Sequence, residues 1–169
     1  GVRDVGMAVV LQIMVRAEAA GVMFTRAPDR PTAKERIVNV SFGLGTPVVD
    51  GVATPDTLRL DESGNVLEET LATKTRTLVI GDDGPVEIAS SDPRRAALPA
   101  ERRAELAAAA LKLESLDDRA WDVEFACDDR RAWIVQARPV TGRGCPEGGT
   151  ADTIWSSANV GEALPGVAT

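Results

Sequence analysis

The sequence has no histidine and no tyrosine, and only three tryptophans, three phenylalanines and two cysteines in 169 residues. Without histidine, no imidazole within these residues acts as a general base, carries a phosphoryl group or binds a metal. Two cysteines, Cys127 and Cys145, are too few for a disulfide framework or a zinc site. These absences exclude histidine-based catalysis and the common zinc-binding modules from this stretch of chain.

Long apolar runs and basic stretches are missing as well. The longest apolar segment, residues 7–15, is interrupted by Gln12 and falls short of the roughly 20 residues that span a bilayer. The net charge is −7, and no basic stripe or aromatic platform is visible, so we expect no nucleic-acid partner. With no secretory signal in view, we expect a cytoplasmic protein with no membrane partner.

The composition is that of a globular domain, with 44% hydrophobic and 27% charged residues. Because the chain lacks an initiator methionine and stops inside a segment, we expect it to be a piece of a longer polypeptide. A stretch rich in glycine and proline predicts a linker near the end. We therefore predict a domain at 1–141, a linker at 142–150 and the truncated start of another segment at 151–169.

Alternating and β-branched segments predict a chain made mostly of strands. Residues 7–15 are expected to form a buried strand, and further strands are expected at 20–25, 36–42, 56–61, 66–73, 77–80 and 85–89. Lys74 and Arg76, which lie between two predicted hairpins, are interpreted as surface charges, with a phosphate-facing rim as the alternative.

One long helix is predicted near residues 99–116. Its apolar stripe is expected to contain Leu98, Leu106, Leu113 and Leu116. Together with the strands, this helix predicts an α+β fold with a mostly antiparallel sheet.

Residues 121–141 predict a hairpin with one apolar and one polar face. The apolar residues occupy odd positions in both strands: Trp121, Val123, Phe125, Trp133, Val135 and Ala137. A shift of one residue would put one strand's polar set on the wrong face, so the alternation also fixes the pairing register.

The register brings polar groups together on one face of this hairpin. It sets Glu124 opposite Gln136 and Asp122 opposite Arg138, with the turn centred on Arg130. Carboxylate and amide oxygens suit Mg²⁺, which shares its coordination with substrate phosphates, and an arginine fork suits the phosphates themselves. An amphipathic hairpin with a solvated polar face has the same pattern, so the residues alone leave both interpretations open.

A glycine pair follows the strand predicted at 36–42. Gly43 and Gly45 flank Leu44 and allow a close backbone approach, and a helix opening after them would offer N–H groups to an anion. A plain strand-to-helix turn has the same composition, so this motif alone does not identify a site.

The order of these segments resembles the nucleotide-binding domain of the phosphoenolpyruvate synthase and pyruvate phosphate dikinase family, with rifampicin phosphotransferases equally similar. The resemblance is carried by a strand containing Gln12, AGVMFTRAP, the Gly-Leu-Gly turn, a β-rich stretch, a helix, and D-x-E followed by Q-A-R-P-V-T. The tail at 155–166 is similar to the segment that follows this domain in such proteins. The resemblance implies the C-terminal half of an ATP-grasp domain, in which ATP is clamped between two α+β subdomains.

The resemblance also implies roles for residues of the predicted hairpin. Glu124 and Gln136 correspond to the pair that coordinates Mg²⁺ at the triphosphate of ATP. Arg138 corresponds to the arginine that contacts phosphate, and we expect it to be the catalytic residue.

Three more residues match the family's nucleotide contacts. Gln12 corresponds to a glutamine beside the backbone that meets the adenine. Gly43 and Gly45 correspond to the Gly-Leu-Gly motif. The acidic residue that usually follows that motif is Thr46 here, which puts a role for this side chain in doubt.

Members of the family use ATP to phosphorylate a histidine on a carrier domain, and the phosphoryl group then passes to pyruvate or an antibiotic hydroxyl. The carrier domain, and an N-terminal ATP-grasp subdomain with a phosphate-binding lysine and arginine, would be partners outside this chain. We therefore expect these residues alone to bind nucleotide weakly and not to turn it over. Two other hypotheses are a non-catalytic nucleotide-binding module that kept the fold and an α+β interaction domain.

Overall fold

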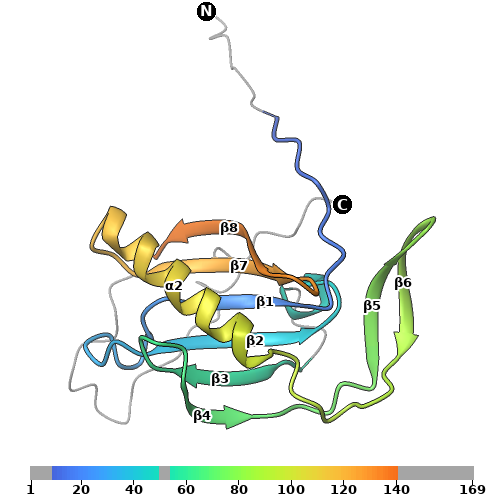
Figure 1. Ribbon diagram of the computed structural model, residues 1–169, viewed down its shortest axis with the longest axis horizontal. Helices are drawn as coiled ribbons and strands as arrows, with labels where there is room; N and C mark the ends of the chain where they lie inside the picture. The colour runs from blue at the N-terminus through green and yellow to red at the C-terminus, as the bar shows by residue number, and fades with distance from the viewer. Residues whose placement is uncertain (1–8, 50–53, 141–169) are drawn as a thin grey trace, which may run out of the picture.

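The computed structural model describes residues 9–49 and 54–140, and its main feature is a six-stranded antiparallel sheet (Figure 1). The strand order is β4–β3–β2–β1–β7–β8. The bounds are β1 (Ala19–Phe24), β2 (Arg36–Phe42), β3 (Asp56–Leu60), β4 (Val66–Thr70), β7 (Trp121–Cys127) and β8 (Ala132–Pro139).

Two further strands and two helices complete the described fold. β5 (Arg76–Gly81) and β6 (Gly84–Ala89) form a separate hairpin that projects from the sheet in Figure 1. A short helix, α1 (Thr46–Val49), follows β2, and the long helix α2 (Ala100–Leu116) crosses one face of the sheet. The predicted α+β class, with an antiparallel sheet and one long helix, is confirmed. Neither of these helices is long and apolar enough to cross a bilayer.

The hydrophobic core lies between α2 and the sheet. Leu106 and Ala110 of α2 are both 0% exposed and belong to the same cluster as Met23 and Val123 of the sheet. Leu116, the last residue of the predicted stripe, is 71% exposed, because only the earlier turns of the helix lie over the core. The opposite face of β7 and β8 is not covered by α2 and carries the even-numbered side chains of β7.

Asp56 ties the start of β3 to two connecting segments. Its Oδ1 accepts a hydrogen bond from the amide of Ala72 at 2.9 Å, and its Oδ2 accepts one from the amide of Ala97 at 2.8 Å. Lys74 forms a buried ion pair with the same carboxylate. The interpretation of Lys74 as a surface charge is therefore wrong, because a buried partner compensates its charge.

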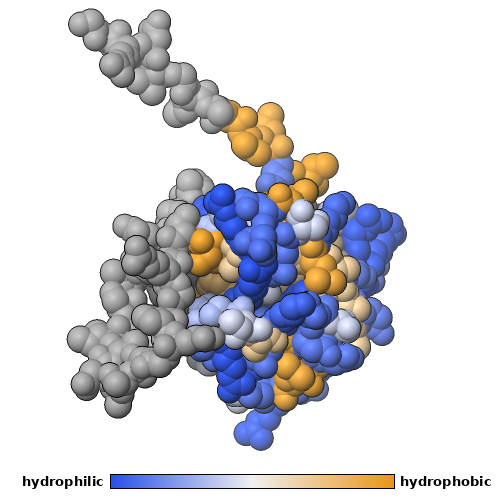
Figure 2. Space-filling model, turned by 90° about the vertical axis from the view of Figure 1, so that its left-hand side faces the viewer, coloured by the Kyte–Doolittle hydropathy of each residue, from blue (hydrophilic) through white to orange (hydrophobic). Residues whose placement is uncertain are grey.

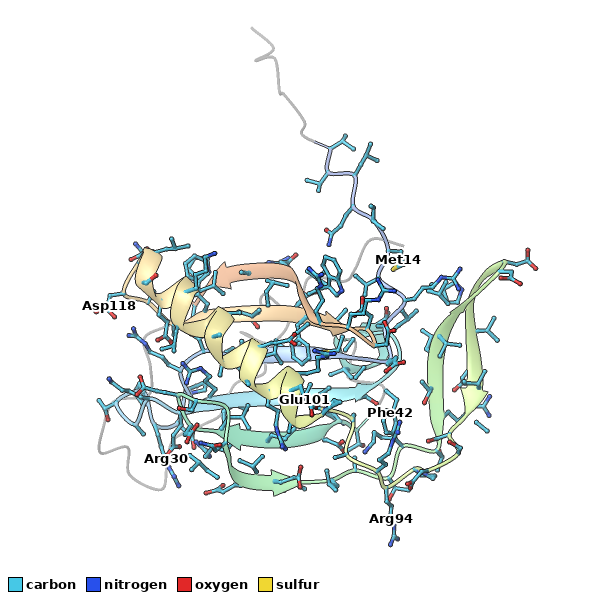
Figure 3. All side chains as sticks on the ribbon, viewed as in Figure 1. Met14, Arg30, Phe42, Arg94, Glu101 and Asp118 are labelled. Carbon is cyan, nitrogen blue, oxygen red and sulfur yellow. The ribbon has the colours of Figure 1, made fainter. Side chains whose placement is uncertain are left out.

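The expected buried strand at 7–15 is wrong for the residues that the structure describes. Residues 9–14 form an exposed arm, with Leu11 95% and Ile13 91% exposed (Figure 1). A strand needs a neighbour to accept its hydrogen bonds and to cover its side chains, and no described strand pairs with the arm. Figure 2 shows the arm's apolar surface standing clear of the body, and Figure 3 shows Met14 at its base.

The linker predicted at 142–150 and the segment predicted at 151–169 lie outside the described residues, as does the final residue of the domain predicted at 1–141.

Candidate functional site

The open face of β7 and β8 brings together the four polar residues that the register predicted. Asp122 pairs with Arg138, and Glu124 pairs with Gln136. The amide Nε2 of Gln136 donates a hydrogen bond to Oε1 of Glu124 at 3.2 Å. The two side chains therefore lie on the same face, which is the arrangement that the metal-binding hypothesis requires.

Asp122 is the member of this group whose carboxyl is in an unfavourable environment. Its carboxyl is half-buried, and its Oδ1, which is inaccessible to solvent, has no hydrogen-bond partner among the residues that the structure describes. Burial raises the pKa of Asp122, the neighbouring charge of Glu124 raises it further, and Arg138 opposes both. Among the described residues Arg138 forms no salt bridge, and its charge acts on Asp122 across the strand pair.

This group fits a divalent cation bound together with a phosphate-bearing ligand. No cluster of three or more His, Cys, Asp or Glu side chains suited to a metal occurs within 9–49 and 54–140. Glu124 and Gln136 supply two oxygen ligands, and Mg²⁺ commonly takes only one or two protein ligands beside substrate phosphates and water. The Oδ1 of Asp122, which has no hydrogen-bond partner among the described residues, is a further group that a bound cation or donor could satisfy.

A β-bulge changes the second half of the hairpin. Glu124 pairs with Gln136, but Phe125 pairs with Ile134, so Val135 is the extra residue. The turn therefore centres between Asp129 and Arg130, and not on Arg130 as expected. Because of the bulge, the three β8 residues before Val135 point to the opposite faces from those that the alternation predicted.

Trp133 is the residue most affected by the bulge. It pairs with Ala126, which lies two residues from Glu124 and hence on the same face of β7, away from α2. The expectation that Trp133 faces the core is wrong, and its side chain is 41% exposed. Nε1 of Trp133 donates to Oδ2 of Asp128 at 2.8 Å, and Arg131 lies over the ring at 5.0 Å from its centroid.

A groove of about 800 Å³ runs between the arm and the start of β8. Gln12 lines it from the arm, and Trp133, Ile134 and Val135 line it from β8. Gln12 is thus exposed on the arm and is not part of a buried strand. It lines the same groove as the three residues directly before Gln136.

The structure explains much of the Gly-Leu-Gly motif by packing. Gly43 has φ +74°, and a Cβ there would come within 2.1 Å of the carbonyl oxygen of Leu78 in β5. The amide of Leu44 donates to that same oxygen at 2.8 Å. Gly45 lies against the buried Ala20 of β1, on the side of the sheet that faces away from α2. α1 begins at Thr46 but has only four residues. A nucleotide contact by Gly43 or Gly45 stays a prediction.

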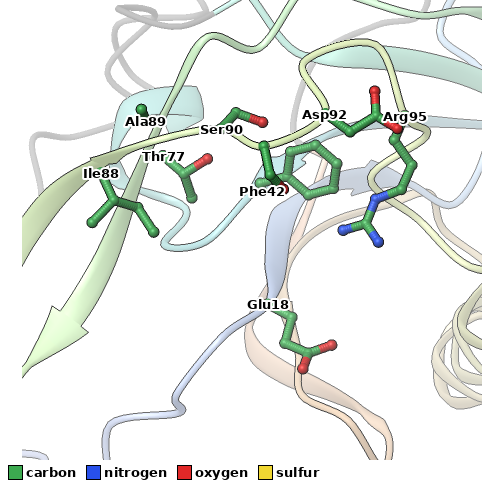
Figure 4. A pocket seen from close by; sticks show the side chains of 9 residues that line it. Glu18, Phe42, Thr77, Ile88, Ala89, Ser90, Asp92 and Arg95 are labelled. Atoms are coloured by element: carbon green, nitrogen blue, oxygen red, sulfur yellow. The ribbon is translucent and has the colours of Figure 1, made fainter.

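A second, smaller cavity of about 180 Å³ was not predicted from the sequence (Figure 4). It lies beside Phe42, between the β5–β6 hairpin and the start of β1. Figure 4 shows Glu18 and Arg95 directed toward the same space. The guanidinium of Arg95 lies 4.9 Å and the ammonium of Lys74 lies 5.3 Å from the centroid of the Phe42 ring. Arg95 and Lys74 are far from Phe42 in the sequence, so no local pattern indicated this cluster.

Comparisons with known proteins match nearly the whole chain to one family. Residues 2–155 match the family described as "Pyruvate phosphate dikinase, AMP/ATP-binding domain". The chain is 36% identical to the prodigiosin synthesizing transferase PigC of Serratia marcescens over 83% of its length. It is 34% identical to a probable phosphoenolpyruvate synthase of Archaeoglobus fulgidus and 34% identical to a rifampicin phosphotransferase of a Streptomyces species, each over 82% of its length. It spans 16%, 19% and 16% of these three relatives, respectively.

Proposed function

This chain belongs to the pyruvate phosphate dikinase AMP/ATP-binding domain family, and we propose that it is the part of a phosphotransferase that holds Mg-ATP by its triphosphate. The observation that carries the proposal is the cross-strand group on β7 and β8, where Glu124 meets Gln136 and Asp122 meets Arg138. Two acids, an amide and a guanidinium on one face, where no salt bridge of Arg138 occurs among the described residues, suit a magnesium triphosphate. The relatives named phosphoenolpyruvate synthase and rifampicin phosphotransferase support the same reaction class.

In the proposed site Glu124 and Gln136 would hold Mg²⁺, which would neutralise phosphate charge when bound. Gln136 turns its amide so that Oε1, and not Nε2, faces the ion. Arg138 binds phosphate oxygens through its planar fork and is the catalytic residue. Phosphoryl transfer depends on positioning and charge neutralisation more than on covalent chemistry, so this half of the site has no need of a histidine.

We further propose that the chain is the C-terminal half of an ATP-grasp domain, ending near residue 141 and followed by a linker at 142–150 and a new segment at 151–169. An N-terminal subdomain of the same polypeptide would close over the phosphates. A histidine on a carrier domain would accept the phosphoryl group and pass it to pyruvate or a similar small acceptor. The exposed arm supports the proposal of a neighbouring subdomain. Its apolar side chains are 66% (Met14) to 95% (Leu11) exposed, and exposed apolar surface of this kind is typical of an interaction site.

Substitution of Glu124 tests the proposed function in the complete polypeptide that carries this chain. Glu124→Gln keeps the shape of the side chain but removes one negative charge from the metal site. We expect Mg-dependent ATP turnover to fall by about a hundredfold, the loss typical of removing one charge-stabilising group. Arg138→Lys keeps the charge but loses the fork, and we expect a loss of about tenfold or more.

Glu101→Gln, on the exposed side of α2 (Figure 3), is the matched control and should keep the wild-type rate. Wild-type rates in both site variants would overturn the proposal. If the wild-type polypeptide binds Mg-ATP but does not consume it under any condition, the non-catalytic nucleotide-binding module is the better hypothesis.

A further inference from the structure

We propose that Arg102 and Glu105 of α2 are positioning residues for Gln136, because they hold the first residues of β8 in the register that creates the bulge at Val135. This inference deepens the proposed function and rests on it, since Gln136 is one of the two proposed Mg²⁺ ligands. Arg102 and Glu105, here called the α2 clamp, act through the backbone of the hairpin and not by contact with the nucleotide.

Glu105 binds the outer edge of β8 at the first residue of that strand. Among the described strands only β7 pairs with β8, so β8 is an edge strand. The amide of Asp128 donates to the carbonyl oxygen of Arg131 at 3.1 Å. Hydrogen-bonded and non-hydrogen-bonded pairs alternate along an antiparallel ladder, so the next pair, Cys127 with Ala132, shares no hydrogen bond. The amide of Ala132 therefore points outward, where it donates to Oε2 of Glu105 at 2.6 Å.

Arg102 orients the carboxylate of Glu105 and adds a second contact to the turn. Its Nη1 forms an ion pair with Oε1 of Glu105, three residues later on the helix. Its Nη2 donates to the carbonyl oxygen of Asp129 at 3.0 Å. The side chain of Arg102 is only 13% exposed, and solvent ions screen a partly buried pair less than an exposed one. The α2 clamp thus holds the turn on both sides, at Asp129 and at Ala132.

These contacts fit the bulged register and not the regular one. The alternation of the sequence predicts a regular ladder, in which Trp133 would lie opposite Cys127 and face α2. In the structure Ala132 lies opposite Cys127 and packs against the core, while Trp133 is 41% exposed. A regular ladder would bring the indole to the place of the small Ala132 side chain. The α2 clamp therefore favours the bulged register and offsets the exposure of Trp133.

The bulge lies directly before a proposed metal ligand. Val135 is the extra residue, and Gln136 follows it opposite Glu124. A bulge bends its strand and increases the local twist, and bulges beside active sites redirect side chains in this way. In the bent strand the amide of Gln136 reaches Glu124 at 3.2 Å. We therefore expect a straight β8 to direct Gln136 differently, even though its partner on β7 would be unchanged.

The alternative is that the α2 clamp only stabilises the fold. Changes in the complete polypeptide that carries this chain separate the two roles. Glu105→Ala removes the clamp, whereas Glu105→Gln keeps one oxygen that can accept a hydrogen bond. Deletion of Val135 removes the bulge but keeps the pairing on both sides of it, because Ile134 and Gln136 would then follow each other on alternate faces. Glu101→Ala, an exposed position on the same helix (Figure 3), is the matched control.

The first measurement is hydrogen–deuterium exchange of the polypeptide without metal or nucleotide, followed by mass spectrometry over residues 132–136. Glu105→Ala leaves the amide of Ala132 without its acceptor, so we expect exchange there to be about tenfold faster, the effect of losing one hydrogen bond. Glu105→Gln should stay within about threefold of wild type, because it keeps an acceptor. Glu101→Ala should exchange as the wild type does.

The second measurement is the free Mg²⁺ concentration that gives half the maximal rate of ATP turnover. We expect Glu105→Ala and the deletion of Val135 each to raise it by about tenfold to about a hundredfold, the loss typical of removing a group that orients a metal ligand. Glu105→Gln should stay within about threefold of wild type, and Glu101→Ala should equal it. A role in stability alone would lower the melting temperature of Glu105→Ala but leave its Mg²⁺ requirement unchanged below that temperature.

Two results would overturn the inference and leave the proposed function standing, provided that Glu124→Gln is impaired in the same assay. One is a wild-type Mg²⁺ requirement in Glu105→Ala, which would limit the α2 clamp to stability. The other is a wild-type Mg²⁺ requirement after deletion of Val135, which would show that the bulge does not direct Gln136. Wild-type behaviour of Glu124→Gln as well would overturn the proposed function together with this inference.

Discussion

Asp122 gives the residue-scale reason to prefer a ligand site over a solvated polar face. On a solvated face its carboxylate would be in water and its pKa would stay near the ordinary value. Instead, burial and the neighbouring Glu124 raise the pKa of Asp122, and its buried Oδ1 has no donor within the part of the chain that the structure describes. An unsatisfied acid of this kind costs stability unless a cation or a donor arrives. A bound magnesium triphosphate would bring that cation, which is why we favour the proposal.

Cys127 should be unreactive as long as the chain is folded. It is only 2% exposed in the core, and burial raises the pKa of its thiol to about 12, so almost none of the reactive thiolate is present at neutral pH. We expect no modification of Cys127 by a thiol reagent in the native Cys145→Ser variant, and rapid modification of one thiol after denaturation in urea. Labelling of the native variant at the rate of the unfolded one would show that this end of β7 opens.

At the scale of elements, the hairpin of β7 and β8 shows what alternation predicts and where it stops. The pairs at Asp122 and Glu124 followed from the sequence, because polar and apolar residues alternate without interruption there. The bulge could not be predicted, because Val135 fits the same alternation of polar and apolar residues. The turn is instead held by long-range contacts, including the amide of Ala132 donating to Glu105 of α2 at 2.6 Å.

The remaining elements also include some that the sequence predicted and some that it could not predict. Strands separated by glycine turns were predicted well, because Gly64 and Gly84 take positive φ where the chain reverses. The burial of Lys74 was not predictable, since its partner Asp56 lies 18 residues earlier and meets it only in the folded sheet. The arm failed as a buried strand because its apolar residues indicate burial but not by which neighbour.

Asp128 should make the β7–β8 turn sensitive to acid. The hydrogen bond from Trp133, followed by those from the amides of Arg131 and Arg130, lowers its pKa from 3.8 to about 2. A lowered pKa means that the stabilisation is complete above the unfolded value of 3.8 and is lost as the pH falls toward about 2. We expect Asp128→Asn to lower the urea midpoint at pH 7, and the wild type to approach the variant as the pH falls through this window.

Asp129→Asn, in the same turn, is the control for Asp128, because its carboxylate lies 3.9 Å from Arg130 in a weak, exposed ion pair. It should leave the urea midpoint unchanged at every pH. A constant gap between wild type and Asp128→Asn from pH 7 to pH 2 would contradict the charge explanation.

Gly43 joins the β5–β6 hairpin to the sheet, and its substitution should be costly for that reason. Gly43→Ala meets both a positive φ and the carbonyl of Leu78 at 2.1 Å, so we expect a loss of roughly 1–3 kcal/mol or more in the free energy of unfolding. Gly84→Ala has φ +127° but no atom within 4 Å, and Gly45→Ala meets only Ala20 at 3.4 Å. These two controls separate backbone strain from the clash. Equal losses at Gly43 and Gly84 would show that the contact with Leu78 contributes nothing.

At the scale of the whole molecule, the groups proposed to bind the nucleotide all lie away from α2. The polar group on β7 and β8, the groove at Trp133 and the apolar arm all lie on parts of the body that α2 does not cover. The chain also spans 16% of the length of the prodigiosin synthesizing transferase and 19% of that of the synthase from Archaeoglobus. Under the proposed function, this chain supplies one side of the ligand site and another part of the polypeptide supplies the other side.

The affinity of the isolated chain for Mg-ATP follows from this arrangement. Ligand sites reach high affinity when they bury most of the ligand surface. A site with only one of its two subdomains would leave the phosphates in water, which weakens each contact. We therefore expect calorimetry on the 169 residues to show only weak Mg-ATP binding and no ATP hydrolysis. The complete polypeptide should bind at least about a hundredfold more tightly, because two closing surfaces act on one tethered ligand site. Tight binding by the isolated chain would mean that β7, β8 and the arm form the whole site, and the proposal of a second, phosphate-closing subdomain would then be wrong.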